Sequence, residues 1–346
     1  MGLSRTELGR VERVCERDLD DRKLRVELVR VLRDAVPFAD YAWLLTDPET
    51  TVGCAPLADV RCLPELPRLI GLRYRTTVNR WTTLTGAASL DQVTAGDLGQ
   101  SLVWREMLQR YAVGDVATVA FRDAFGLWGW VDLWRSRGEP PFSADEIRFL
   151  ADCAAPVTHA LRRAQARHFS EDAPTHAPNG VAVLMLTAQL DVLAQTPQTT
   201  EYLRLLVPPA VGESPIPAGA FNVAAQLLAV EAGVDTNPPS SRVHLHGGRW
   251  VTLRAVRIGA EAGRRDIAVT IELTAPSDRL AVFVRAAALS PREAELVGLV
   301  VAGLDSKEIA GRMFLSLLTV QDHLKSVFAK TATRSRRELV TVVRGG

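Results

Sequence analysis

The segment between Lys307 and Arg336 combines hydroxyl, amide and charged side chains in a pattern suited to contact with a nucleic acid. Val320, Leu324 and Val327 recur at helical spacing and predict the buried stripe of a helix. The outward side is then left for groups that bond base edges or neutralise phosphates. The side chains that we predict to contact DNA are Ser316, Thr319, Gln321, Asp322, Lys325, Ser326, Lys330, Arg334, Arg336 and Lys307.

Helix-start signals surround this segment. The pairs with the spacing of a capping box are Ser290 with Glu293, Asp305 with Glu308, and Ser335 with Glu338. Ser316 is the expected N-cap of the helix that carries the stripe, and Gly303 suits the left-handed end of an earlier helix. Because only a short turn at Phe314 separates two of these helices, the pattern predicts a helix-turn-helix motif.

The last sixth of the chain resembles the LuxR-type, or GerE-like, DNA-binding domain. The residues that match its pattern are Leu289, Pro291, Arg292, Glu293, Gly303, Lys307, Glu308, Ile309, Ala310, Leu315, Ser316, Thr319, Val320, His323, Leu324, Lys330, Ser335, Arg336 and Leu339. The resemblance implies a four-helix unit that binds two-fold DNA sites as a dimer, often paired through the fourth helix. It also implies that the third helix reads the major groove through Gln321, Asp322 and Lys325.

Several positions depart from the pattern of that family. Leu317 and Leu318 stand where polar residues are usual, and Thr331 and Thr333 stand where apolar residues are preferred. The two threonines predict looser packing beneath the third helix. Asp322 either accepts a hydrogen bond from a cytosine amino group or repels phosphate, so the departures concern the target sequence and affinity more than the fold.

Composition excludes several other classes of protein. The 346 residues predict two or three domains, and a net charge of +1 confines any basic surface to a local patch. Four cysteines without paired spacing, no apolar signal segment and no run of eighteen apolar residues predict a cytoplasmic protein that does not enter a membrane.

Chemical motifs outside the C-terminal segment are few. No catalytic constellation or phosphate-binding loop is present, so we expect neither an enzyme nor a bound cofactor. His244 and His246 lie two apart on one predicted strand face but lack a third ligand in the sequence, which favours packing over metal binding.

Patterning along the chain predicts a multidomain α+β fold, with antiparallel-sheet domains followed by an all-α helix-turn-helix domain. We place the first domain with its flanking helices at residues 1–169, a Pro-rich linker at 170–180, a second sheet domain at 181–280 and the helix-turn-helix domain at 281–346. The first domain resembles a GAF domain through Phe121-Arg122-Asp123, Trp128-Gly129 and Pro141-Phe142-Ser143. The second weakly resembles a PAS domain in strand order and position.

Both of these resemblances imply a pocket for a small effector between sheet and helices. Trp128, Trp130 and Trp134 fall on one face of a predicted strand because side chains alternate along it. The candidate ligand contacts are Trp104, Phe121, Trp128, Trp130 and Trp134, although packing in the core is the interpretation that we favour for the indoles.

Two functional hypotheses follow from these patterns. The first is a one-component transcriptional regulator that senses a small molecule or another signal and binds operator DNA as a homodimer. The alternative is a sensor or scaffold that acts through protein–protein contacts and carries a degenerate DNA-binding domain. Salt dependence separates them, since phosphate contacts make DNA affinity fall steeply as salt rises.

Overall fold

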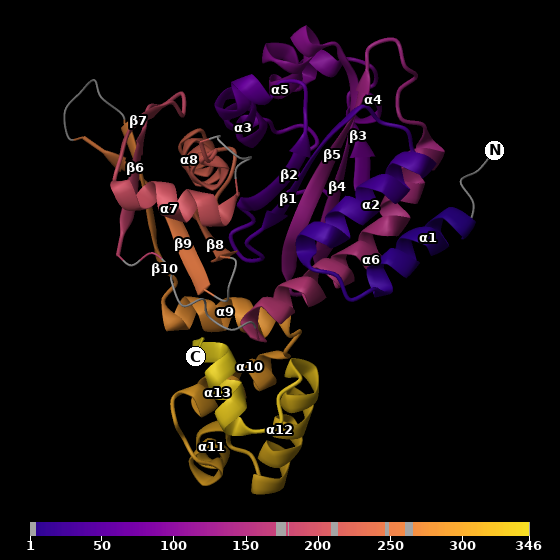
Figure 1. The fold of residues 1–346 in the computed structure, drawn as a ribbon. Helices are drawn as coiled ribbons and strands as arrows, with labels where there is room; N and C mark the ends of the chain where they lie inside the picture. The colour runs from indigo at the N-terminus through magenta and orange to yellow at the C-terminus, as the bar shows by residue number, and fades with distance from the viewer. Residues whose placement is uncertain are drawn as a thin grey trace.

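The computed structural model describes residues 5–170, 178, 180–208, 214–245, 249–259 and 266–345. Within these ranges the chain forms two five-stranded antiparallel sheets, and a group of helices follows them at the C-terminal end (Figure 1). The predicted multidomain α+β fold class is therefore confirmed. No helix in the described ranges combines the length and the apolar character needed to span a membrane.

The first unit is built on a sheet with the strand order β2-β1-β5-β4-β3. Its strands are β1 (Asp40–Thr46), β2 (Gly53–Asp59), β3 (Ala87–Ser89), β4 (Val113–Asp123) and β5 (Gly126–Ser136). Its helices are α1 (Arg5–Glu16), α2 (Asp21–Ala35), α3 (Leu66–Arg75), α4 (Leu90–Val93), α5 (Leu102–Glu106) and α6 (Ala144–Arg167), with short 3-10 turns at Leu63–Glu65, Leu98–Gln100, Leu108–Tyr111 and His168–Ser170. Figure 1 shows α1, α2 and α6 together on one side of the sheet and α3 and α5 on the other.

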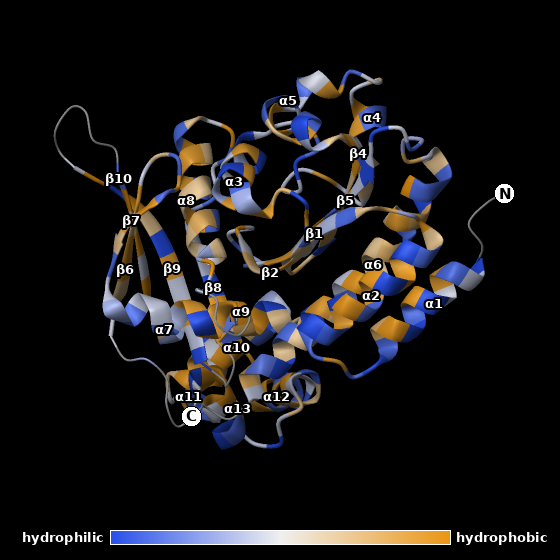
Figure 2. Ribbon diagram, turned by 45° about the horizontal axis from the view of Figure 1, so that its top comes forward, coloured by the Kyte–Doolittle hydropathy of each residue, from blue (hydrophilic) through white to orange (hydrophobic). Residues whose placement is uncertain are grey.

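The second unit has a sheet with the order β7-β6-β10-β9-β8. Its elements are β6 (Ala182–Leu186), β7 (Val192–Gln195), α7 (Pro197–Leu206), α8 (Ala218–Glu231), β8 (Ser240–Leu245), β9 (Arg249–Ile258) and β10 (Asp266–Leu273). Helix α8 contacts β9 on one side and both α3 and β2 of the first unit on the other. Figure 2 shows it largely in hydrophobic colours, as expected for a helix buried on all sides.

The C-terminal helices are α9 (Pro276–Ala286), α10 (Pro291–Val301), α11 (Ser306–Met313), α12 (Leu317–Thr331) and α13 (Arg336–Arg344). Helix α9 crosses the predicted domain boundary between residues 280 and 281 and packs against α6 and α13. The last four helices enclose a small core of their own, to which α12 contributes the predicted stripe of Val320, Leu324 and Val327. Most of the predicted linker at 170–180 lies outside the described residues.

Candidate DNA-binding face and sensor cavity

Side-chain caps fix the ends of the C-terminal helices. Ser290 with Glu293 and Asp305 with Glu308 form complete capping boxes, which confirms both predictions. The predicted box at Ser335 is only half formed and needs correction. The Ser335 hydroxyl accepts from the backbone N–H of Glu338, but the Glu338 carboxylate accepts from the backbone of Arg334 at 2.7 Å.

The turn of the helix-turn-helix motif is set by two residues. Phe314 ends α11 in the left-handed region, with φ of 55°. Ser316 then caps α12, since its hydroxyl accepts from the backbone N–H of Thr319 and lies 2.8 Å from the Thr319 hydroxyl. Thr319 is thereby held at the first turn of α12, where its side chain is half-buried.

Gln321, Asp322 and Lys325 are exposed on the outward side of α12. Asp322 and Lys325 lie one turn apart, with a nitrogen–oxygen distance of 3.5 Å. Both side chains are more than half exposed, so this ion pair is weak and leaves the lysine available to another anion.

Ser326 is half-buried and turned toward the helix bundle, which corrects the expectation that it points outward, whereas Lys330 is exposed and reaches back to the bundle with its ammonium group. The Ser326 hydroxyl and the Lys330 ammonium donate to opposite oxygens of Glu293 on α10, each at 2.6 Å. Glu293 is 4% exposed. Burial alone would raise its pKa, but the hydrogen bonds from Lys330, Ser326 and Ser290 lower the pKa of Glu293 to about 2.

Arg336 also serves the fold, since it donates to the carbonyl oxygen of Leu304 at 3.0 Å and to the Ser306 hydroxyl at 3.1 Å. Lys307 and Arg334 are exposed and make no ion pair within the described ranges. Residues 281–346 hold ten lysines and arginines against six acidic residues, a net charge of +4 in a chain whose total is +1. The basic surface is therefore local, as phosphate contact requires.

The two threonines that depart from the family pattern satisfy each other. The Thr331 hydroxyl donates to the backbone oxygen of Val327 at 2.8 Å and lies 2.9 Å from the Thr333 hydroxyl. Thr333 is 6% exposed. The pair makes hydrogen bonds at the C-terminal end of α12, at positions where the family prefers apolar residues.

A helix-turn-helix with an exposed polar and basic second helix defines a DNA-binding domain. Residues 287–343 match the family model described as bacterial regulatory proteins, luxR family, so the C-terminal helices are a LuxR-type domain as the resemblance implied. A monoamine regulon transcriptional regulator of Klebsiella aerogenes is 46% identical over 55 residues, which cover 16% of this chain and 24% of that protein.

Two further relatives match over segments of similar length. A protein of Mycobacterium tuberculosis named as an HTH-type transcriptional regulator is 50% identical over 52 residues, 15% of this chain and 6% of its own. A protein of Cyanophora paradoxa named as a transcriptional regulator is 43% identical over 51 residues, 15% of this chain and 24% of its own. The chain thus spans a quarter or less of the length of these curated relatives.

A cavity of about 240 Å³ lies between the first sheet, α3 of the first unit and α8 of the second. Of the five candidate ligand contacts, Trp130 and Trp134 line it. Phe121 stacks on Trp43 instead, with ring centroids 5.1 Å apart, and the Trp104 indole donates to the backbone of Val113 at 3.0 Å.

Trp128 is also absent from the described lining of the cavity. The register between β4 and β5 shifts at this point, so that Phe121 pairs with Gly129 and Arg122 with Leu127. Trp128 is the residue left over, and its indole donates to Asp123 at 2.9 Å. Of the three indoles predicted to share one face of the strand, two therefore line the cavity, and the third, Trp128, does not.

The same wall of the cavity holds a buried ion pair. Asp132 on β5 accepts from Nε and Nη2 of Arg73 on α3, at 2.9 and 3.1 Å, and from the Thr118 hydroxyl at 2.6 Å. The Trp81 and Trp130 rings stack on each other with centroids 4.7 Å apart, and the guanidinium lies about 5 Å from each centroid. Sequence reasoning missed this pair because its members are 59 residues apart.

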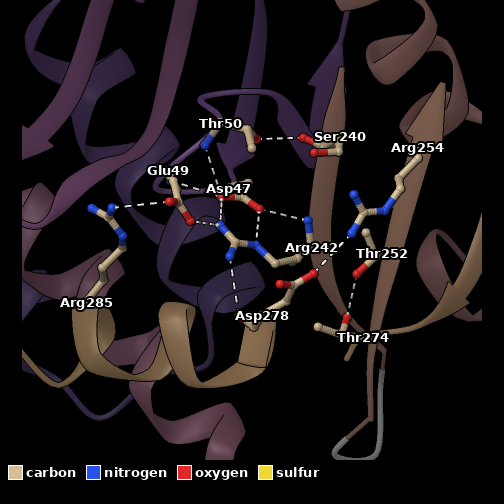
Figure 3. A network of polar contacts seen from close by, with 10 residues as sticks. All are labelled: Asp47, Glu49, Thr50, Ser240, Arg242, Thr252, Arg254, Thr274, Asp278 and Arg285. Atoms are coloured by element: carbon tan, nitrogen blue, oxygen red, sulfur yellow. Dashed lines mark hydrogen bonds and ion pairs between the residues drawn. The ribbon is translucent and has the colours of Figure 1, made fainter. Parts of the chain in front are cut away.

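A second ion pair joins the two sheet units (Figure 3). Asp47, fully buried in the turn after β1, accepts from Nε and Nη2 of Arg242 on β8, both at 2.7 Å. Arg242 also donates to Glu49 at 2.8 Å and to the backbone oxygen of Asp278 on α9 at 3.3 Å. Burial would lower the pKa of Arg242, but the hydrogen bonds and charge of Asp47 raise it above its ordinary value.

The histidine pair considered as a metal site is only partly described. His244 stacks on His168 with ring centroids 4.2 Å apart, and His246 lies outside the described residues. Among the side chains that the structure describes, no three His, Cys, Asp or Glu residues gather as a metal site.

Proposed function

We propose that the chain is a one-component transcriptional regulator. Its LuxR-type domain binds operator DNA as a homodimer, and the two sheet units act as GAF-like and PAS-like sensors of a small molecule or another signal. The single observation that carries this proposal is the outward face of α12, where Gln321, Asp322 and Lys325 are exposed beside the local basic surface. Of the other predicted contacts, Lys307 lies in the first turn of α11, Ser316 and Thr319 at the start of α12, and Arg334 just beyond the end of α12.

The DNA-binding step is tested with the full-length chain. DNA that co-purifies with the protein is sequenced, and the recovered fragments are used in gel shifts over a series of salt concentrations. Wild-type affinity should fall steeply with salt, because binding displaces the ions that surround the phosphates. Lys325→Ala should weaken binding about tenfold, as expected for the loss of one charged contact.

Lys23→Ala is the matched control for this experiment. Lys23 is 75% exposed and pairs with Asp20 three residues before it, just as the 77% exposed Lys325 pairs with Asp322. It lies on α2, far along the chain from the LuxR-type domain. Equal affinities for the Lys325 and Lys23 variants would refute the role of Lys325.

A second function, a scaffold that acts through protein contacts, has one observation in its favour. Phe314 is 94% exposed, Leu318 67% and Leu317 44%, all at the turn and first residues of α12. Exposed apolar residues that gather in this way mark interaction surfaces. DNA affinity that does not depend on salt, or no DNA binding at all, would favour the scaffold.

A further inference from the structure

Residues of both sheet units line the cavity. One wall is a face of the first sheet that carries Trp130, Asp132 and Trp134. The opposite side includes Ala218 and Asn222 of α8, which belongs to the second unit. Anything bound in this cavity therefore touches both units at once.

Five buried polar atoms on the lining residues have no hydrogen-bond partner within the described part of the chain. They are Nδ2 and Oδ1 of Asn222, Nε1 of Trp130, Nε1 of Trp134 and Oδ1 of Asn79. Asn222 is 1% exposed, and both ends of its amide are unpaired, so the conclusion is the same whichever way the amide is turned. Folded proteins pair most of their buried polar atoms, so five unpaired atoms around one cavity indicate a partner that enters it.

The charge of the cavity wall restricts what that partner can be. Arg73 and Asp132 are the charged residues of the described lining, and they pair with each other through two hydrogen bonds. A charged ligand would be buried without a counter-ion, which is strongly unfavourable. Most of the remaining wall is apolar, including Leu44, Leu69 and Val116.

The volume restricts the partner further. About 240 Å³ exceeds the roughly 150 Å³ of a cavity that takes benzene, and is below the roughly 300 Å³ at which pockets for drug-sized molecules begin. A bicyclic molecule of moderate size is therefore appropriate for this space.

We infer that the cavity binds an uncharged, mostly apolar molecule that presents a hydrogen-bond acceptor beside a donor, as a carboxamide does. Asn222 pairs with both groups, and the indole N–H groups of Trp130 and Trp134 donate to acceptor atoms. The bound molecule joins β5 of the first unit to α8 of the second. This inference rests on the sensor role proposed above and adds to it the chemical class of the effector and the residue that selects it.

Three matched probes test the chemistry on the full-length chain by isothermal titration calorimetry. They are 2-naphthamide, the charged 2-naphthoate and the apolar 2-methylnaphthalene. The amide should bind at least tenfold more tightly than the carboxylate. No binding of the amide up to its solubility limit, or equal binding of the carboxylate, would overturn the inference whether or not any variant folds.

Asn222→Leu tests the recognition residue, because leucine has the same number and branching of side-chain heavy atoms as asparagine and no polar atoms. The variant should bind the amide at least tenfold more weakly and methylnaphthalene as the wild type does, which also reports that it is folded. Its melting temperature without ligand should equal or exceed that of the wild type, because two unpaired atoms are removed. Unchanged binding of the amide would show that Asn222 serves only the fold and does not recognise the ligand.

Trp134→Phe and Trp43→Phe form the matched pair for the indoles. Each removes a buried indole N–H that has no partner in the described structure, but only Trp134 lines the cavity. Only the Trp134 variant should weaken amide binding. These titrations contain no DNA, so their outcome does not depend on the gel shifts that test the proposed regulator function.

Discussion

The buried pair of Asp47 and Arg242 allows a prediction about how the sheet units are joined. Arg242→Ala removes two side-chain hydrogen bonds of 2.7 Å from a carboxylate that is 0% exposed. Breaking a buried ion pair by removing one partner costs roughly 3–5 kcal/mol. Asp47 keeps backbone donors from Glu49, Thr50 and residue 242, so we expect a cost near the lower end, about 3 kcal/mol.

Hydrogen exchange measured by mass spectrometry on the full-length chain locates this effect. A loss of about 3 kcal/mol should raise exchange about a hundredfold in β8 and in the turn that holds Asp47, if opening of the interface limits exchange there. The control is Arg254→Ala, because Arg254 is half exposed and its pair with Asp278, at 3.1 Å, lies at the edge of the network in Figure 3. That variant should change exchange by less than about threefold. An Arg242 variant that exchanges like the control would refute the reasoning.

Two further predictions concern the C-terminal helices. Glu293→Gln should destabilise them by about 2 kcal/mol at pH 7. Because the pKa of Glu293 falls from 4.5 to about 2 on folding, its contribution to stability is complete above pH 4.5 and is lost toward pH 2. The free energies of unfolding in urea of the variant and the wild type should therefore converge as the pH falls. A difference that stays constant with pH would contradict this prediction. Arg279→Met should loosen α13, because the buried guanidinium donates to the backbone oxygens of Val342 and Val343 at its C-terminal end. Amide exchange in α13 should rise at least tenfold while that in α10 stays constant, and an unchanged α13 would show that α9 does not hold it.

Local sequence signals predicted the elements whose ends and buried faces are set by residues close together in the chain. Capping residues and a single apolar stripe identified α10 to α12, because each signal acts within one helical turn. Alternation identified the strands for the same reason. Helix α8 has no such local signal, since a helix that is buried on all sides lacks a polar face to give it a period.

Side chains that act through distant partners could not be assigned in this way. The hydrogen bonds of Ser326 and Lys330 to Glu293 have no local sequence signal, because Glu293 lies 33 and 37 residues earlier and only the packing of α10 on α12 brings it to them. Asn222 gave no signal, because one amide in an apolar helix is unremarkable until the helix closes a cavity. Arg242 and Asp47 are 195 residues apart and belong to different sheets.

A series of contacts leads from the joint between the two sheet units to the LuxR-type domain. Asn222 and Arg242 belong to the second unit, and Arg242 donates to the backbone oxygen of Asp278 in the first turn of α9. The next residue, Arg279, holds the C-terminal end of α13. A change in how the sheet units pack therefore acts on two neighbouring residues of one helix. A route is evidence of coupling only if a change at one end alters the other. Amide exchange in α13 of the Arg242→Ala variant tests this coupling. Because α13 lies outside the Asp47 network, its exchange should change only if α9 moves as a unit.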